Sequence, residues 1–554
     1  MAESAVLKHF SRDPGLKTAL SVILGLALFR LILLLLSPLP LHADETQYWI
    51  WSQTFDFGYF SKPPLIAWVI ALSTSLFGDS EAAVRLPVIF LHSGTASFIL
   101  LILRHIGAPR VGFWSAIVYL TMPAIWLSAG IMSTDTLLLC AWSGALYALL
   151  RLRSEQTWPT GIALGVAIGL GFLAKYAMIY FVVGLGLAMV FDPLTRRALL
   201  SLKGLAAGML ALAIFSPNIA WNAAHDFATV SHTAANANWG GDMFHPGEML
   251  DFILGQFGIL GPALFPLLVI TVWQVLRRLA AGLSGAVTET FADPVDAHAG
   301  LLVGFVWPPI VIVSLQAFLS RAHANWAAAA YVGGIILVTA FLLRGPNWRR
   351  VVLLASIGVH TFLGLLGTVM IFSPGFTEWI GAENAFKRVR AWRETGTLVE
   401  EVSRAAPYTA VLFDDRNVFH QMQRYAPDLA APQYMWWRYS GPTNHAEREW
   451  PMPDGLEGDL LVISHRPLEV DRIRQDFRQM EAVDTLIIPL GGEKVRELTV
   501  WRVNIHERVP RDTAYEDYWL GVDAAKRAGE APAILTPEDR AIGTGSEQPE
   551  PQRP

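Results

Sequence analysis

The run TALSVILGLALFRLILLLLSPL, residues 18–39, decides the class of this protein. Its only charged residue is Arg30, and a helix crosses the hydrocarbon core of a bilayer with about 20 apolar residues. A cleaved signal peptide has a shorter apolar core and a small residue before the cleavage site, whereas LPLHADE follows here, with Leu41 in that place. We therefore expect an uncleaved first membrane span.

The composition extends this expectation to the whole chain. Of the 554 residues, 53% are hydrophobic and 16% are charged, whereas a typical soluble protein has about 25% charged residues. The net charge of -5 excludes a general attraction to nucleic acid. Cys140 is the only cysteine, so the chain forms no internal disulfide. These features are typical of a polytopic membrane protein.

Apolar segments recur along the chain and predict about eleven spans. They lie at about 18–37, 83–103, 111–128, 132–150, 158–172, 174–191, 203–222, 251–276, 300–319, 326–343 and 350–372. The stretch 64–77 is short for a span, and we expect a re-entrant or interfacial helix there. The expected fold is mainly α, a polytopic membrane helical bundle with juxtamembrane helices.

Basic residues are distributed unequally between the two sets of loops. Cytoplasmic loops of membrane proteins carry an excess of Lys and Arg. With the N-terminus in the cytoplasm, the cytoplasmic segments contain Lys8, Arg12, Lys17, Arg104, Arg110, Arg151, Arg153, Arg196, Arg197, Lys203, Arg277, Arg278, Arg344, Arg349 and Arg350. The opposite loops contain only Lys62, Arg85, Lys175 and Arg321. This asymmetry and the odd number of spans predict that the C-terminus lies outside.

The chain changes character after the transmembrane region, residues 1–377. Residues 378–525 are expected to form a small α/β domain on the outer side, because β-like runs alternate with amphipathic helical patterns. The predicted strands lie at 409–414, 458–464, 484–490 and 497–503, and the predicted helices at 388–406 and 470–483. Residues 526–554 are rich in Pro, Gly and Glu and are expected to form a disordered tail.

Charged residues gather at the outer membrane boundary, where charge close to lipid is costly. The set consists of the carboxylates Asp44, Glu45 and Asp135 and the cations Lys62, Arg85, Lys175 and Arg321. Any one cation is explained equally well as an anchor that snorkels to the interface. The short carboxylates cannot snorkel, and an anionic ligand at the interface accounts for the four cations together.

A lipid phosphate fits this description, because its head lies at the boundary and its tail in the bilayer. Arg binds phosphate with two hydrogen bonds, and Lys supplies a point charge. A carboxylate near the phosphate repels it, so its presence needs another explanation. General-base catalysis is one, in which the carboxylate accepts the proton of an attacking hydroxyl. The pattern favours a site in which cations hold a leaving phosphate while a carboxylate faces an acceptor hydroxyl.

These stretches resemble a known family, the lipid-linked-sugar glycosyltransferases of the GT-C fold. The closest similarity is to bacterial protein O-mannosyltransferase-like enzymes and to the aminoarabinose transferases of lipid A. It lies in HADETQYW (42–49), YFSKPPL (59–65), EAAVRLP (81–87), LGFLAKY (170–176) and SRAHANW (320–326). The resemblance covers roughly residues 18–372 and the architecture of an outer C-terminal domain. Each motif alone is short. The resemblance depends on the order and spacing of the motifs and on their position on the same side of the membrane.

The resemblance implies a polyprenyl-phosphate sugar as donor and a transfer with inversion. It implies Asp44 as the base or acceptor-orienting carboxylate, with the adjacent Glu45 as a further catalytic candidate. Lys62 is the implied contact to the lipid phosphate, and Asp135 supports the acceptor site. We add Arg85, Lys175 and Arg321 as phosphate-binding candidates and Tyr59 as a residue that lines the sugar pocket.

The resemblance also bears on metal dependence. The aminoarabinose transferases have an acidic residue just before the lysine of the KPP motif, associated with a metal site, whereas this chain has Ser61. Fixed cations stabilise a phosphate leaving group without a metal. No cofactor is therefore expected; a divalent metal is not expected, although the sequence does not exclude one.

The loop 223–250 contains His225, His232, His245 and Trp239. Its histidines are spaced too loosely for a zinc site of the HxxxH type. Trp239 either stacks on a sugar ring as part of a loop over the site or belongs to an ordinary surface loop. His323 and Asn325 either line the donor pocket or cap the tenth span.

The leading hypothesis is an integral membrane glycosyltransferase of the bacterial inner membrane. Its expected partners are a polyprenyl-phosphate-linked sugar, an acceptor such as lipid A, lipopolysaccharide core or another envelope glycan on the periplasmic face, and membrane lipids. Alternatives are a protein O-glycosyltransferase with the same donor and a transporter or flippase of lipid-linked sugars. Alternating access requires polar groups reachable from both sides, whereas the unusual charges lie on one side. The sequence leaves the sugar open.

Overall fold

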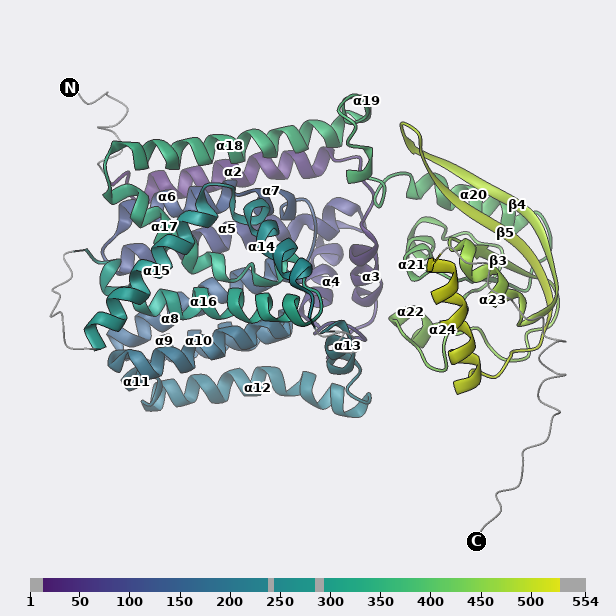
Figure 1. Cartoon of the computed structure of the whole chain (residues 1–554), viewed down its shortest axis with the longest axis horizontal. Coiled ribbons are helices and arrows are strands. Elements are labelled where there is room, and N and C mark those ends of the chain that lie inside the picture. The colour runs from purple at the N-terminus through teal and green to yellow at the C-terminus, as the bar shows by residue number, and fades with distance from the viewer. Residues whose placement is uncertain (1–12, 238–243, 284–292, 529–554) are drawn as a thin grey trace, which may run out of the picture. The chain divides into compact units, whose positions relative to one another are not determined.

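The computed structural model describes residues 13–237, 244–283 and 293–528 and divides the chain into two compact units. The helical unit comprises Met1–Pro38 and Trp51–Phe376, and the αβ unit comprises Leu39–Ile50 and Thr377–Pro554. Helices α3 (Ala43–Ser52) and α19 (Pro374–Trp379) contain boundaries between the units. Figure 1 shows the elements of both units. The short segment Leu39–Ile50 therefore belongs with residues that are distant in sequence.

The helical unit is built from long apolar helices that run back and forth (Figure 1). Its helices are α2 (Leu16–Leu36), α4 (Leu65–Phe77), α5 (Glu81–His105), α6 (Pro109–Thr121), α7 (Pro123–Ser128), α8 (Thr134–Glu155), α9 (Trp158–Ala174), η1 (Tyr176–Met178), α10 (Ile179–Phe191), α11 (Pro193–Leu199), α12 (Leu202–Ala224), α13 (Ala228–Ala237), α14 (Pro246–Leu260), α15 (Leu264–Leu283), α16 (Asp296–Leu319), η2 (Ala324–Ala327), α17 (Ala330–Arg344) and α18 (Asn347–Phe372). The labels η1 and η2 mark 3₁₀ helices.

The lengths of these helices are those of a multi-pass membrane protein. Within the described residues, 7 helices are long and apolar enough to cross a membrane, or up to 8 if the bent pair Tyr176–Phe191 and Pro193–Leu199 is one span. Helices α4, α9 and α17 are apolar but shorter. The eleven predicted segments all contain a helix, but the count of eleven spans is not confirmed by length.

Two of the predicted spans are broken. The segment 111–128 is divided into α6 and α7, because Pro123 begins a new helix and has no N–H for the preceding turn. The segment 251–276 is divided into α14 and α15 at Gly261, whose φ of 113° is outside the helical range. The predicted short helix at 64–77 is α4, with 13 residues.

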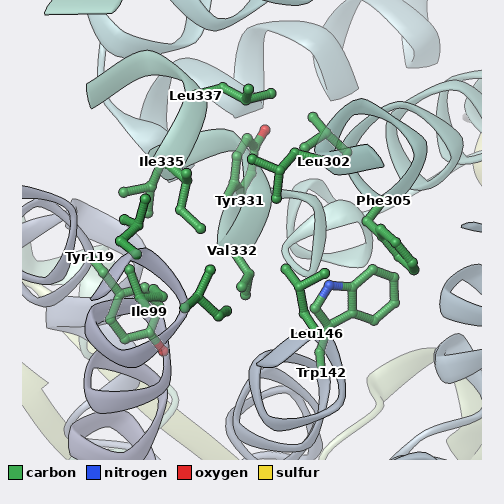
Figure 2. Packing of buried hydrophobic residues seen from close by; sticks show 14 of the residues in the cluster. Ile99, Tyr119, Trp142, Leu146, Leu302, Phe305, Tyr331, Val332, Ile335 and Leu337 are labelled. Atoms are coloured by element: carbon green, nitrogen blue, oxygen red, sulfur yellow. The ribbon is translucent and has the colours of Figure 1, made fainter. Parts of the chain in front are cut away.

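The core of the helical unit lies between α5, α6, α8, α16 and α17 (Figure 2). The indole of Trp142 meets the rings of Phe181 and Phe305 edge-on, with centroids 5.0 and 6.4 Å away. A Cβ atom at Gly184 would lie 2.6 Å from the Phe305 ring, so the glycine allows α10 to pack closely on α16. On the other side, α2 exposes many of its leucines, as a lipid-facing helix does.

Ion pairs gather at one end of the helical unit, called here the arginine end. Arg153 binds both carboxylate oxygens of Asp192, at 2.7 and 3.1 Å. Arg344 pairs with Asp293 and Asp296, at 2.5 and 2.7 Å. All these residues lie in loops or helix ends that the sequence assigns to the cytoplasmic side.

The αβ unit contains a 5-stranded sheet of order β2-β1-β3-β5-β4. Its strands are β1 (Ala410–Phe413), β2 (Gln433–Met435), β3 (Leu460–Ser464), β4 (Phe477–Gly491) and β5 (Lys494–His506). Strands β2, β1 and β3 are parallel, whereas β5 is antiparallel to β3 and β4. The helices are η3 (Glu383–Ala385), α20 (Trp392–Arg404), α21 (Arg416–Tyr425), α22 (His445–Glu449), η4 (Pro467–Glu469), α23 (Val470–Arg474) and α24 (Thr513–Ala528).

The four predicted strands and the helix at 388–406 are present in this unit, as β1, β3, β4, β5 and α20. The predicted helix at 470–483 is wrong after Arg474, because β4 begins at Phe477. The paired strand β5 runs beside β4 from His506 to Lys494, and cross-strand pairing outweighs the local helical pattern. The sequence did not predict β2, α21 or α24.

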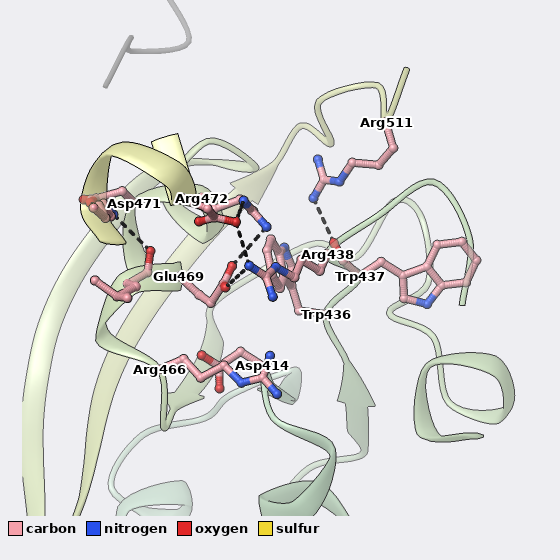
Figure 3. Close-up of polar contacts among 12 residues, drawn as sticks. Asp414, Trp436, Trp437, Arg438, Arg466, Glu469, Asp471, Arg472 and Arg511 are labelled. Carbon is pink, nitrogen blue, oxygen red and sulfur yellow. Dashed lines mark hydrogen bonds and ion pairs between the residues drawn. The ribbon is translucent and has the colours of Figure 1, made fainter. Parts of the chain in front are cut away.

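Ion pairs connect α24 to α23 and to the segment after β2, through Arg472 and Arg438, which Figure 3 shows. Arg438 and Arg472 both donate to Asp523 of α24, at 2.9 and 3.1 Å, and Arg472 is only 1% exposed. The guanidinium of Arg472 also lies over the Trp519 ring of α24. Helix α24 continues to Ala528, and the rest of the predicted tail lies outside the described residues.

Candidate functional site

The structure brings three of the predicted site residues together in the helical unit. The Lys175 ammonium contacts Oδ1 of Asp135 at 2.7 Å, and the Asn325 amide donates to Oδ2 of the same carboxylate at 2.9 Å. Both side chains of the ion pair are 19% exposed. The end of the helical unit at which these residues lie is called here the site end.

Three different segments supply this triad. Asp135 lies in the first turn of α8, where the helix dipole favours a carboxylate. Lys175 has extended φ and ψ angles at the joint between α9 and η1, which aims its side chain out of the helix. Asn325 lies in η2, which Gln256 of α14 holds by donating to the Ala324 carbonyl at 3.2 Å. The triad therefore fixes the ends of α8, α9 and η2 relative to one another.

A second polar cluster adjoins Lys175 along the chain. The Tyr176 hydroxyl donates to Asn218 at 2.8 Å and accepts from Asn222 at 3.0 Å. Asn218, which is fully buried, also donates to the Phe57 carbonyl at 2.7 Å. These contacts connect the segment after α9 to the loop that carries the KPP motif.

The loop 53–64 is held in one conformation by its own contacts. The single hydrogen of the Tyr59 hydroxyl is shared between the carbonyls of Trp51 and Thr54, 2.9 and 2.7 Å from its oxygen, and the ring stacks on Trp51. The Tyr59 backbone N–H donates to the Lys62 carbonyl at 3.1 Å, which closes a turn in front of the lysine. Tyr59 is 5% exposed. It positions the loop, and its contact with a sugar stays a prediction.

Glycine is required at one position of this loop. A Cβ atom at Gly58 would lie 2.3 Å from the Trp221 ring and 3.0 Å from the Asn218 amide. The loop backbone therefore lies directly on α12, and Thr229 at the start of α13 donates to the Tyr59 carbonyl at 2.7 Å. Lys62 follows this supported turn and is half-buried.

The remaining predicted cations of the helical unit differ in burial. Arg85 lies near the start of α5 and is 3% exposed. Arg321 lies between α16 and η2 and is exposed; among the described residues no side-chain hydrogen bond or ion pair of its guanidinium is found. His323 is exposed beside it, with its ring edge against Trp326.

The acidic pair lies on α3, in the αβ unit, and its two members have different roles. Glu45 is fully buried, and its carboxylate accepts the His42 backbone N–H at 2.8 Å. This is the reciprocal contact of a capping box, in which an acidic side chain satisfies an unpaired N–H at the helix start. Asp44 is exposed, and its backbone N–H contacts Nδ1 of His42 at 3.3 Å. Asp44 thus presents a carboxylate, while Glu45 stabilises the turn beneath it.

The candidate residues of the loop 223–250 either make contacts within the helical unit or lie outside the described structure. The Nδ1–H of His225 donates to the Trp221 carbonyl at 2.8 Å, and the His225 ring stacks on the Trp221 indole. The His245 backbone N–H donates to the Phe318 carbonyl. Trp239 lies outside the described residues, and the side chain of His232 is not described. Within the described residues no group of three or more His, Cys, Asp or Glu side chains could hold a metal ion.

Sequence reasoning missed Tyr176, Asn218 and Asn222. A signal was present, because Asn218 and Asn222 are polar residues one helical turn apart in an apolar segment. Polar residues in a membrane span mark a packed or functional face.

The chain is similar in sequence to known proteins. Residues 61–221 match the family model of dolichyl-phosphate-mannose-protein mannosyltransferases. The lipid A galacturonosyltransferase RgtD of Rhizobium johnstonii is 29% identical over 450 residues, which cover 81% of this chain and 91% of that protein. An undecaprenyl phosphate-α-4-amino-4-deoxy-L-arabinose arabinosyl transferase of Yersinia enterocolitica is 28% identical over 174 residues, 27% of this chain and 31% of that protein.

The fold is also that of a solved structure. ArnT from Cupriavidus metallidurans bound to undecaprenyl phosphate superimposes with a TM-score of 0.59 over 88% of this chain and 98% of that one, at 14% sequence identity. The apo state of ArnT gives a TM-score of 0.58. The family match and the relatives make this chain similar in sequence to membrane glycosyltransferases, and it shares the fold of ArnT, the GT-C fold.

Proposed function

We propose that this protein transfers a sugar from a polyprenyl-phosphate donor to lipid A or the lipopolysaccharide core, at the periplasmic face of the bacterial inner membrane. The proposal depends mainly on the triad of Lys175, Asp135 and Asn325 at the end of the helical unit opposite the arginine end. The names of the relatives support it, because they describe lipid A and lipopolysaccharide core galacturonosyltransferases.

In the proposed reaction an acceptor hydroxyl attacks the anomeric carbon of the donor sugar. Its proton passes to the exposed carboxylate of Asp44. The bond between the anomeric carbon and the phosphate oxygen breaks, and the electron pair leaves with the phosphate. The products are the glycosylated acceptor, with inverted configuration at the anomeric carbon, and polyprenyl phosphate.

The cations of the site stabilise the charge that develops on the leaving phosphate. Lys62 is the first candidate, and Arg85 and Arg321 are further ones. Lys175 has three N–H donors, one of which contacts Asp135. In this proposal Asp135 aims Lys175, and the other donors of the ammonium serve the phosphate.

The first sugar and acceptor to test are galacturonic acid and lipid A. The relative with these names aligns over 81% of this chain, whereas the arabinosyl transferases align over 27%. A uronic acid adds a second negative charge to the donor, and a site with several cations suits such a donor. Mass spectrometry of lipid A and core from cells with and without the protein identifies the transferred sugar.

The direct test is transfer activity of Asp44→Asn and Lys62→Ala in membranes that contain the lipid-linked donor. Both variants are expected to lose most of the activity, since one removes the proton acceptor and the other a phosphate contact. Arg151→Gln, at the arginine end, is the matched charge control. Full activity in both Asp44→Asn and Lys62→Ala would contradict the assigned roles.

The same assay separates the enzyme from a flippase. Purified protein in detergent has no membrane compartment, so product formation there requires catalysis and not transport. Failure of the purified protein to form product, with transfer restored only in sealed vesicles, would favour the transport hypothesis.

A further inference from the structure

Two side chains of α21 in the αβ unit hold both sides of the segment that carries Asp44. The Gln421 amide nitrogen donates to the Leu41 carbonyl at 3.0 Å, and its oxygen lies 3.2 Å from the Thr46 hydroxyl, which can donate to it. The Leu41 backbone N–H donates to the Tyr425 hydroxyl at 2.8 Å. Leu41 precedes Asp44 by three residues and Thr46 follows it by two. The contacts therefore bracket the exposed carboxylate.

These contacts are buried, although the carboxylate between them is not. Gln421, Leu41 and Thr46 are each 0% exposed. A buried amide whose oxygen and nitrogen both find partners is oriented firmly, because breaking either hydrogen bond leaves an unsatisfied polar group. The start of α3 is thus clamped to α21.

A third contact reaches the other half of α3. The guanidinium of Arg424 lies over the Trp49 ring, with 4.4 Å between its central carbon and the ring centroid. Helix α21 therefore contacts α3 before and after Asp44, through residues spaced at one face of α21. This explains why Leu39–Ile50 belongs to the same compact unit as the C-terminal residues.

We infer that Gln421 and Tyr425 are positioning residues for the transfer reaction, and that the αβ unit acts by fixing the orientation of α3 and its carboxylate. The inference rests on the proposed function of Asp44. The chain passes through α3 between two parts of the helical unit. Helix α21 thereby contributes to catalysis by positioning Asp44, without itself contacting the donor or the acceptor.

The expected effect follows from the geometry of proton transfer. A displacement of about 1 Å at a reacting group lowers the rate by roughly 100-fold. Gln421→Ala removes both bracketing hydrogen bonds, so we expect kcat to fall roughly 10- to 100-fold. The donor binds through cations of other segments, so its KM is expected to change by less than about threefold. Tyr425→Phe removes only a hydroxyl and is expected to have a smaller effect on kcat.

Full-length protein in detergent is the material for the test, with Asp44→Asn measured in parallel. Gln423→Ala is the matched control: it is the same substitution on the same helix, and within the described residues the Gln423 side chain makes no hydrogen bond. Hydrogen exchange of the peptide 41–50 is the second readout. It is expected to rise in Gln421→Ala and Tyr425→Phe, while exchange of β1 stays at the wild-type level.

The outcomes are distinguishable. A lower kcat with near-normal donor KM and faster exchange in 41–50 supports the inference. Wild-type kcat in both Gln421→Ala and Tyr425→Phe, with an inactive Asp44→Asn, overturns the inference and leaves the proposed function standing. Full activity of Asp44→Asn overturns the role of Asp44 and the inference with it. If Gln421→Ala does not accumulate as folded protein, Tyr425→Phe decides by the same two readouts.

Discussion

At the scale of single residues, the Asp135–Lys175 contact differs from an ordinary surface ion pair. Each side chain is 19% exposed, and the carboxylate serves two partners on different segments. Surface pairs contribute about 0–1 kcal/mol. Removing one partner of a mostly buried charged hydrogen bond costs more, because the other charge stays desolvated.

We therefore expect Asp135→Asn to lower the stability of the purified protein by about 1–3 kcal/mol, seen as a lower melting temperature in detergent. Glu155→Gln is the comparison. It breaks the ion pair between Glu155 and Arg151, which are one turn apart on α8 and more exposed than Asp135 and Lys175. That substitution is expected to leave the melting temperature almost unchanged, because exposed i,i+4 pairs contribute little. Equal shifts for the two variants would show that the Asp135 carboxylate adds nothing beyond a surface pair.

Two adjacent carboxylates in the αβ unit have opposite pH behaviour. Burial raises the pKa of Asp414 to about 6, against the effect of hydrogen bonds from Ser464 and the His465 N–H. Burial would also raise the pKa of Asp415, but its ion pair with Arg466 and the N–H groups of α21 together lower it. Asp414 thus takes up a proton on folding between about pH 4 and 6.

The unit therefore loses the Asp414 contribution to its stability as the pH rises through about 6. The loss amounts to roughly 3 kcal/mol, for a rise of about two pKa units at 1.36 kcal/mol per unit. Asp414→Asn is expected to be more protected from hydrogen exchange in β1 and β3 than the wild type at pH 7, with the gain diminishing at pH 5. A gain of equal size at both pH values would contradict the raised pKa.

At the scale of elements, the break between α6 and α7 needs an outside donor. The interruption at Pro123 leaves carbonyls of the last turn of α6 without helical N–H partners. The guanidinium of Arg30, in the middle of α2, donates to the Leu120 carbonyl and lies over the Trp126 ring of α7. Arg30 is 7% exposed. A charge within the first span is thus explained by the break in its neighbour.

We expect Arg30→Leu to destabilise the protein by about 1–3 kcal/mol, measured as the melting temperature in detergent. Leu35→Ala is the control, because Leu35 lies on the same helix and is 63% exposed. This substitution is expected to leave the melting temperature nearly unchanged. Pro123→Ala restores a backbone N–H and lets α6 continue toward α7. The double variant should therefore lose less stability than the sum of the two single variants. If the stability losses of the two single variants simply add in the double variant, the role of Arg30 does not depend on the break at Pro123.

The elements also show where local sequence is sufficient. Long apolar runs predict α2, α5, α8 and α16, because burial in lipid follows from composition alone. The end of the predicted helix 470–483 depends instead on β5, which is its partner only in the folded unit. The strand β2 has three residues and is defined by its register with β1. Such short elements have no periodic signal to predict them.

At the scale of the whole molecule, the candidate site was predictable as a list of residues but not as a set of contacts. Lys175, Asp135 and Asn325 come from three motifs, and their meeting at one carboxylate depends on how α8, α9 and η2 end. The membership of Leu39–Ile50 in the αβ unit depends on Gln421 and Tyr425, far along the chain. Contacts between distant residues leave no pattern in a single sequence.

The orientation of the molecule connects these scales, because transfer at the periplasmic face requires the site end to lie outside. The positive-inside rule assigns the arginine end to the cytoplasm. With Cys140 replaced by Ala, a single cysteine reports the side of each end. Gly130 lies between α7 and α8 at the site end and has room for a side chain, and Thr157 is exposed between α8 and α9 at the arginine end.

A membrane-impermeant thiol reagent applied to cells with a permeabilised outer membrane should label Gly130→Cys and leave Thr157→Cys unlabelled. Thr157→Cys should react only after the inner membrane is disrupted. The two positions are separated by one helix, α8, so a single crossing decides the result. The reverse labelling pattern would place the Asp135 triad on the cytoplasmic side, where an acceptor on the periplasmic face of the membrane is out of reach.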